Sequence, residues 1–216
     1  MNYQSKEHDK MKGIPEGELP QVTAFQDEFT RKFMDSTEPV QEGYYLFRSG
    51  VNGFTMLFPE NAKMADKVYS APGDHYEYTS FGGDYGLKES NEVYSVDIKY
   101  QNDVYADHVD SQLNSLRRFL KDGEFEEISM SGKTIYYGSG KKEFEHENDT
   151  VYAFFSYIKA KERHQGIRFM YSATCQDAEK PCNLDVEKEE EKAKRLMESV
   201  TFIDADLEER SDQDGE

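Results

Sequence analysis

Residues 93–100 read Val-Tyr-Ser-Val-Asp-Ile-Lys-Tyr, a stretch in which Val93, Ser95, Asp97 and Lys99 alternate with Tyr94, Val96, Ile98 and Tyr100. Because successive side chains of a strand point to opposite faces, this alternation predicts a β-strand. At residue 103 the period of the apolar residues changes to about 3.6, which predicts a helix of about four turns that stops at Gly123. The change of period indicates a domain that combines strands and helices, in the α+β class.

Similar patterns extend in both directions from this stretch. Further helices are predicted over residues 21–36, where apolar side chains recur at three- and four-residue steps, and over residues 185–199. Aromatic residues on both sides of the strand at 151–159 predict that the centre of the sheet is covered on both faces. Strands are predicted at 44–48, 54–58, 67–70, 75–81, 124–130, 133–141, 151–159, 166–174 and 200–203, with Gly82-Gly83 in a turn.

The ends of the chain differ from its middle in composition. Residues 1–20 contain two prolines and two glycines with little apolar content, so we expect a flexible leader or tether. Residues 21–203 are predicted to form a single α+β domain. Residues 204–216 hold seven acidic residues and one arginine, which is typical of a disordered acidic tail.

The charge of the chain limits its partners. With 26 basic and 44 acidic residues, the net charge is −18. Such a surface repels phosphate backbones and anionic lipids, so nucleic acid is not an expected partner. No segment has the roughly 20 apolar residues that would span a bilayer, and membrane contact is expected only through a lipid anchor outside this sequence.

Cys175 and Cys182 are the only two cysteines and lie seven residues apart, after a predicted strand. In an oxidising compartment they can close a small loop as a disulfide, which is our prediction. In the cytosol the same pair would be two free thiols. The spacing matches neither a thioredoxin-type motif nor a zinc knuckle.

Two groups of residues have metal-ligating chemistry. Asp74, His75 and Glu77 place two carboxylates and an imidazole where a strand is expected to begin, a set that zinc or manganese can use. A solvated loop is the alternative, because a fourth ligand is missing. A second, anionic bend contains Glu143, Glu145, His146, Glu147 and Asp149, which is either a weak calcium site or a solvated hairpin tip.

The sequence lacks the common catalytic motifs. We find no Gly-x-Ser-x-Gly elbow, no Gly-Lys-Ser phosphate loop and no His-Glu-x-x-His pair. We therefore expect a protein that is not an enzyme and needs no cofactor; a hydrolase that uses an acidic or histidine-containing cleft is an alternative. The tyrosines at 44–45, 76–78 and 136–137 are candidates for outward rings in a binding patch.

The strand Gly53-Phe-Thr-Met-Leu-Phe-Pro59, the mid-chain helix, the long hairpins and Leu196-Met-Glu-Ser-Val-Thr-Phe202 together resemble the Mog1p/PsbP-like α/β/α sandwich, over residues 43–203. The composition and the polar leader also resemble the mature domain of a Bacillus-type surface lipoprotein. The resemblance implies a mainly antiparallel sheet flanked by helices. It does not imply an activity, because one fold serves many tasks.

By this resemblance we expect a non-enzymatic, extracytoplasmic domain that is anchored to the cell membrane by lipid. It would act as a binding or assembly factor at the cell envelope, for example in surface or biofilm organisation. Its partner would be an envelope protein or a surface polymer. The alternative is a cytosolic, Mog1p-like adaptor that binds a basic protein.

Overall fold

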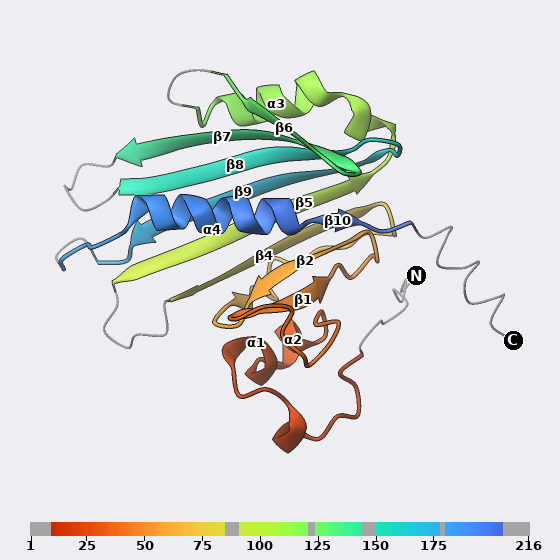
Figure 1. Ribbon diagram of the computed structural model, residues 1–216, viewed down its shortest axis with the longest axis vertical. Coiled ribbons are helices and arrows are strands. Elements are labelled where there is room, and N and C mark those ends of the chain that lie inside the picture. Colours follow the sequence, from red (N-terminus) through yellow and green to blue (C-terminus); the bar gives the residue numbers. More distant parts are fainter. Residues whose placement is uncertain (1–9, 85–90, 121–123, 144–149, 178–179, 205–216) are drawn as a thin grey trace, which may run out of the picture.

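The computed structural model describes residues 10–84, 91–120, 124–143, 150–177 and 180–204, which contain two antiparallel sheets (Figure 1). The strands of the larger sheet are β3 (Lys63–Met64), β4 (Tyr76–Asp84), β5 (Glu92–Asn102), β6 (Glu126–Met130), β7 (Lys133–Glu143), β8 (Thr150–Ala160) and β9 (Gln165–Cys175). Their order across the sheet is β3-β4-β5-β9-β8-β7-β6. The smaller sheet has the order β1-β2-β10 and consists of β1 (Tyr44–Arg48), β2 (Phe54–Pro59) and β10 (Thr201–Phe202). The mainly antiparallel α+β architecture is as predicted.

Alternation along the central strands creates one fully covered face. In β5, Val96 and Ile98 are buried, as are Ile167 and Phe169 on the neighbouring strand β9. These side chains meet the aromatic residues of β1 and β2 in one continuous hydrophobic core. Burial of this apolar surface is the main stabilising contribution to the fold.

Helix α4 (Val186–Ser199) lies along the covered face between β2 and the larger sheet (Figure 1). The helix begins after Asp185, whose carboxylate accepts a hydrogen bond from the Lys188 amide at 3.2 Å. Its apolar stripe of Ala193, Leu196 and Met197 is buried. The helix therefore docks through the residues that the sequence indicated.

The C-terminal end of α4 is held by a buried lysine of β7. Lys133 Nζ donates hydrogen bonds to the carbonyl oxygens of Glu198 and Val200. These carbonyls belong to the end of the helix, where the last carbonyl groups lack helical partners and a cation is favourable. Burial lowers the pKa of Lys133 to about 8, although the nearby Glu198 carboxylate acts in the opposite direction.

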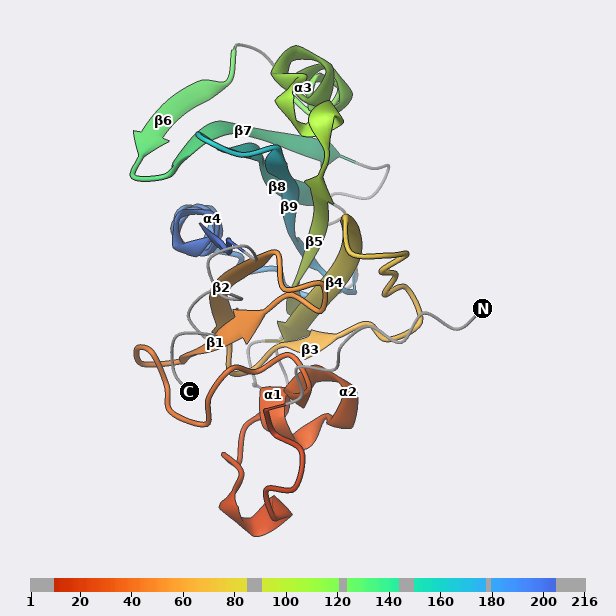
Figure 2. The same ribbon diagram turned by 90° about the vertical axis from the view of Figure 1, so that its right-hand side faces the viewer.

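Helix α3 (Val109–Arg117) packs on the opposite face, at the β7–β8 end of the sheet (Figure 2). Leu116 contacts Phe155 and Tyr157, so β8 is buried on both faces. The cover predicted on both faces at the centre of the sheet does not extend to β5 and β9, where alternate residues are half-buried or exposed. The helix is shorter than predicted, because His108 has non-helical backbone angles of φ −81° and ψ 63°. That break separates α3 from a 3₁₀ turn, η2 (Val104–Asp107), and residues 121–123 lie outside the described residues.

The helix predicted over residues 21–36 is instead two short helices, α1 (Thr23–Gln26) and α2 (Glu28–Arg31). Asp27 breaks the run with extended backbone angles of φ −85° and ψ 118°. Its carboxylate accepts a hydrogen bond from the Thr30 amide at 2.9 Å, so it caps α2. A competing local hydrogen bond of this kind is why aspartate favours caps over helix interiors.

The second half of the predicted leader packs against the domain. Met11 and Leu19 are buried in the core, and a 3₁₀ turn, η1 (Glu16–Glu18), lies just before Leu19. The flexible leader predicted for residues 1–20 is therefore wrong from Met11 onward, because these two apolar side chains find room beside the sheet. Residues 1–9 and most of the predicted tail, 205–216, lie outside the described residues.

Two smaller predictions on the sheet are also wrong. Residues 67–70 form no strand beyond a single bridge from Ser70 to Tyr78, and the edge strand β3 comes earlier in the chain. Gly82 and Gly83 continue β4 rather than forming a turn. At Gly82 a Cβ atom would lie 2.3 Å from the Tyr94 carbonyl oxygen, so the glycine allows close strand pairing.

Among the described residues, no helix combines the length and the apolar character needed to cross a membrane.

Candidate functional site: an open face of the sheet

The face of β4, β5 and β9 that lies opposite α4 is only partly covered, because α3 and η2 approach it from the β8 side and contact only part of β5 and β9 (Figure 2). Alternate residues of these strands are half-buried or exposed here, in contrast to the buried residues between them. The side chains of this open face are Tyr76, Tyr78, Ser80, Ser95, Asp97, Lys99, Gln101, Arg168, Met170 and Ser172.

Two cations lie directly opposite each other at the centre of the open face. Lys99 of β5 pairs in register with Arg168 of β9, and on its other side with Tyr78 of β4. Directly opposed side chains on one face have Cβ atoms about 5 Å apart, and two like charges at that separation destabilise the sheet. The pairing is therefore a local cost to the fold.

The two cations make contacts other than ion pairs. Arg168 Nη1 donates to Ser115 Oγ of α3 at 3.1 Å, and Arg168 Nε is buried without a hydrogen-bond partner. Lys99 Nζ lies 5.2 Å from the centre of the Tyr76 ring, a cation–π contact. Within the described ranges, neither cation forms an ion pair with a carboxylate. Burial lowers the pKa of Lys99, and the charge of Arg168 lowers it further, while Asp103 opposes both.

A tyrosine–aspartate pair borders the cations. Tyr78 Oη donates a hydrogen bond to Asp97 Oδ1 at 2.8 Å, which fixes the ring on the open face. Burial and this hydrogen bond raise the pKa of Tyr78 to about 12. Tyr76 and Tyr78 are two residues apart in one strand, so both rings lie on this side. The open face thus combines two cations, two aromatic rings and short polar side chains, which suits it to binding.

The predicted disulfide is present. Cys175, at the end of β9, is bonded to Cys182, with the sulfur atoms 2.00 Å apart and the Cα atoms 5.8 Å apart. The loop that it closes is also held by Asn91. Its Nδ2 donates to the Asp177 carbonyl oxygen at 2.9 Å, and the Asp177 amide donates to its Oδ1 at 2.7 Å.

Glu77, one of the predicted metal ligands, is fully buried on the covered face. Its carboxylate accepts hydrogen bonds from the amides of Gly50 at 2.9 Å and Val51 at 3.4 Å. Ser49 and Tyr69 side chains complete its partners. Burial raises the pKa of Glu77, and these hydrogen bonds act in the opposite direction. The carboxylate therefore links β4 to the turn between β1 and β2.

The other two predicted ligands lie on the surface. His75 Nε2 is 3.1 Å from Asp74 Oδ1, and their side chains are 70% and 82% exposed. The Glu77 carboxylate does not join them, because its oxygens accept hydrogen bonds from the backbone amides of Gly50 and Val51. Across the described parts of the chain, no three histidine, cysteine or acidic side chains are grouped for a metal ion. The anionic bend of Glu145, His146, Glu147 and Asp149 falls outside the described residues.

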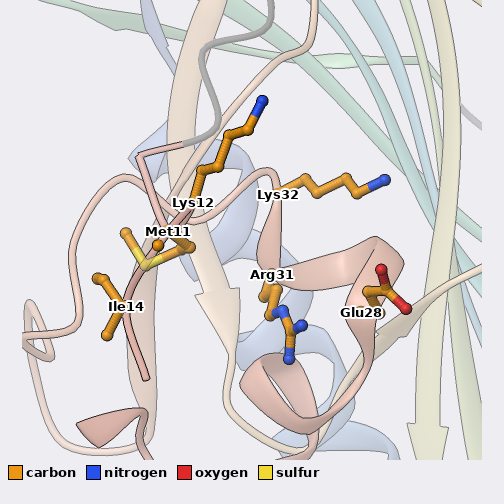
Figure 3. Close-up of a pocket in the computed structure, with 7 residues that line it drawn as sticks. Met11, Lys12, Ile14, Glu28, Arg31 and Lys32 are labelled. Atoms are coloured by element: carbon orange, nitrogen blue, oxygen red, sulfur yellow. The ribbon is translucent and has the colours of Figure 1, made fainter. Parts of the chain in front are cut away.

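A pocket of about 330 Å³ lies between the N-terminal segment and α2 (Figure 3). It is bordered by Lys12, Arg31 and Lys32, with Glu28 among them. Figure 3 shows that the three basic groups point in different directions, so they do not converge on one ligand position. We regard the open face as the stronger candidate site.

Sequence reasoning identified part of the open face. The tyrosines at 76 and 78 were candidates for a binding patch, and the alternation in residues 93–100 puts Asp97 beside Lys99. The pairing of Lys99 with Arg168 depends on strand register across 69 residues of sequence, which local patterns do not specify. No pattern in the sequence indicated that Lys99 and Arg168 would lie opposite each other.

The sheet, its flanking helices and the disulfide-closed loop define an extended α+β domain of the Mog1p-like kind. The chain belongs to the family described as "YvcA_Mog1p: Putative lipoprotein YvcA", which matches residues 20–201. A relative named "Putative lipoprotein YvcA", from Bacillus subtilis strain 168, is 33% identical over 201 residues and covers 90% of this chain and 82% of its own. The resemblance to a Bacillus-type lipoprotein is thereby confirmed.

A solved structure from Bacteroides thetaiotaomicron was also matched. It aligns with a TM-score of 0.43 and 12% sequence identity, over 76% of this chain. The match spans half of the length of that other protein.

Proposed function

We propose that this chain is the extracytoplasmic domain of a lipid-anchored protein and that it binds an envelope partner through the open face. In this proposal it is not an enzyme; it acts as a binding or assembly factor, with surface or biofilm organisation as the process it serves. The observation that carries the proposal is the open face itself, where two unpaired cations and two tyrosines lie on an otherwise acidic molecule.

Two findings support the location. The Bacillus subtilis relative carries the name "Putative lipoprotein YvcA", and the match to it covers most of both chains. The Cys175–Cys182 disulfide suits an oxidising compartment, since cytosolic thiols are normally kept reduced. The disulfide favours this location over the cytosolic adaptor.

The composition of the open face supports binding rather than catalysis. Tyrosine, methionine and arginine are enriched at the centres of protein interfaces, and Tyr76, Tyr78, Met170 and Arg168 all lie on this face. The face contains no histidine or cysteine, the side chains most used as base and nucleophile near neutral pH. Its donors and rings are suited to holding a partner.

Location and binding can be tested in the native host. The intact mass of the purified protein, with and without reductant, should show a diacylglyceryl addition and two protons fewer than the reduced chain. A photo-crosslinking residue in place of exposed Ser95 should capture an envelope partner, whereas the same residue at Glu191, exposed on α4, should not. A reduced and unmodified chain would favour the cytosolic adaptor, and equal capture at both positions would refute the open face as the binding site.

A further inference from the structure

We propose that the open face binds a carboxylate group of a protein partner, which lies between Lys99 and Arg168 and is flanked by the rings of Tyr76 and Tyr78. This inference rests on the proposed binding function and names the chemistry of the ligand. Four kinds of observation support it: the unpaired charges, the donor geometry, the neighbouring rings and the charge of the whole chain.

Among the residues described, Lys99 and Arg168 lack the acidic partners that two other basic side chains of the sheet and its loops have. Lys159 Nζ is 3.0 Å from Asp107, and Arg163 Nη2 is 2.6 Å from Asp204. Lys99 and Arg168 face each other without such a partner in the part of the chain that the structure describes. A bound anion would turn their mutual repulsion into two attractive contacts.

The donors present match a carboxylate. An arginine guanidinium is a planar fork that pairs with two oxygens, and a lysine ammonium adds a mobile point charge beside it. Arg168 is already oriented by its hydrogen bond to Ser115, so little conformational freedom remains to be lost on binding. Lys99 is held over the Tyr76 ring, on the side of the pair away from α3.

The neighbouring side chains would strengthen the contact. Tyr76, Tyr78 and Met170 surround the cations with half-buried apolar surface, which reduces the screening of charge by water. Two carboxylates lie nearby, and both accept hydrogen bonds from other groups of the chain. Asp97 accepts the hydroxyl of Tyr78, and Asp103 lies at the end of β5, where it caps the η2 turn.

The net charge favours a single carboxylate over a polyanion. At −18, the chain would repel a long phosphate polymer along most of its surface. A carboxylate side chain of a protein is attracted locally, within the Debye length of about 8 Å at physiological salt. The tyrosine, arginine and methionine on the face also suit a protein surface better than a polymer of repeating charge.

An acetylated and amidated Gly-Glu-Gly peptide, which carries a single carboxylate, is a suitable probe for the whole chain. With isotope-labelled protein, we expect millimolar peptide to shift the amide resonances of residues 76–80, 95–101 and 166–172 in a saturable way. Lys99→Gln and Arg168→Gln should each weaken this binding by about tenfold or more, because each removes a charge-assisted contact. Lys188→Gln removes the same charge from exposed α4 and should leave it unchanged.

Several outcomes would overturn the inference. It is wrong if these resonances do not shift, or if Lys188→Gln weakens binding as much as Lys99→Gln. Binding of inorganic polyphosphate but not of the peptide would assign the face to a phosphate polymer. Melting curves control for folding: removing one of two opposed cations should keep or raise the melting temperature.

Crosslinking separates this inference from the proposed function. If Ser95 still captures its partner with unchanged yield in the Lys99→Gln and Arg168→Gln variants, the open face binds but the carboxylate is not what it recognises. If position 95 captures nothing in the unmodified background, the binding function itself fails.

Discussion

Replacing Cys182 by serine tests how much the disulfide contributes to stability. Cys182 is the better position because it is exposed, whereas Cys175 is buried and a serine there would also bury a hydroxyl group. The bridge joins cysteines seven residues apart. In the chain-entropy treatment, a loop of about eight residues gives roughly 2.5 kcal/mol of stabilisation, through restriction of the unfolded chain.

For a chain of this length, that loss corresponds to a fall in melting temperature of roughly 5–10 °C. The assay is thermal unfolding followed by circular dichroism, for the unmodified chain and Cys182→Ser, each with and without reductant. Under oxidising conditions the variant should melt lower. In reductant the two proteins should melt together, because Asn91 still holds the loop through Asp177. An equal difference in both conditions would refute the reasoning, since the loss would then come from packing.

Three further changes test the packing and the buried charges. Relative to Lys133→Met, the unmodified chain should gain free energy of unfolding as pH rises from about 8 towards 10.5, because in this range the lysine is protonated in the unfolded chain and neutral in the folded one. Urea unfolding at the two pH values measures the difference between the two proteins, and an unchanged difference would contradict the prediction. Gly53→Ala should destabilise by about 1–3 kcal/mol, because its Cβ would lie 2.2 Å from the buried Tyr100 ring; Gly17→Ala has open space and serves as the control. The pKa of Glu77 in the folded chain is raised, so the stabilisation that its protonated form provides is fully present below pH 4.5 and is lost as pH rises through the folded pKa. The free energy of unfolding, compared with that of Glu77→Gln, should therefore fall between acidic and neutral pH. Parallel pH profiles of the two proteins would refute this.

Much of the sheet could be predicted because its strands alternate over many residues. The strand predicted at residues 44–48 has the observed bounds, and those at 133–141, 151–159 and 166–174 differ from the observed strands by no more than two residues at either end. Burial of alternate residues such as Val96 and Ile98 is what produces the pattern, so pattern and structure have one physical cause.

The helices were harder to predict because single residues decide where they end. Asp27 lies in a run with good helical periodicity, but its carboxylate bonds to the Thr30 amide and starts a new helix. His108 similarly interrupts the period between η2 and α3. Periodicity reports which side chains face the core; it does not report which backbone hydrogen bonds are made.

The candidate site depends on contacts between distant segments. Glu77 has the chemistry of a metal ligand, yet it lies under the turn at Gly50 and Val51, 26 or more residues earlier. Lys99 and Arg168 meet only because β5 and β9 are neighbours in the sheet. The disulfide could be predicted because its two cysteines are close in sequence.

The pairing of β10 with β2 has a consequence for the order of folding. Thr201 pairs with Thr55, so the small sheet joins segments from opposite ends of the domain. Forming such distant contacts requires closure of a long loop, which slows folding. The small sheet therefore cannot be completed until β10 has left the ribosome, so β2 waits for its partner while more than 140 residues between them are synthesised.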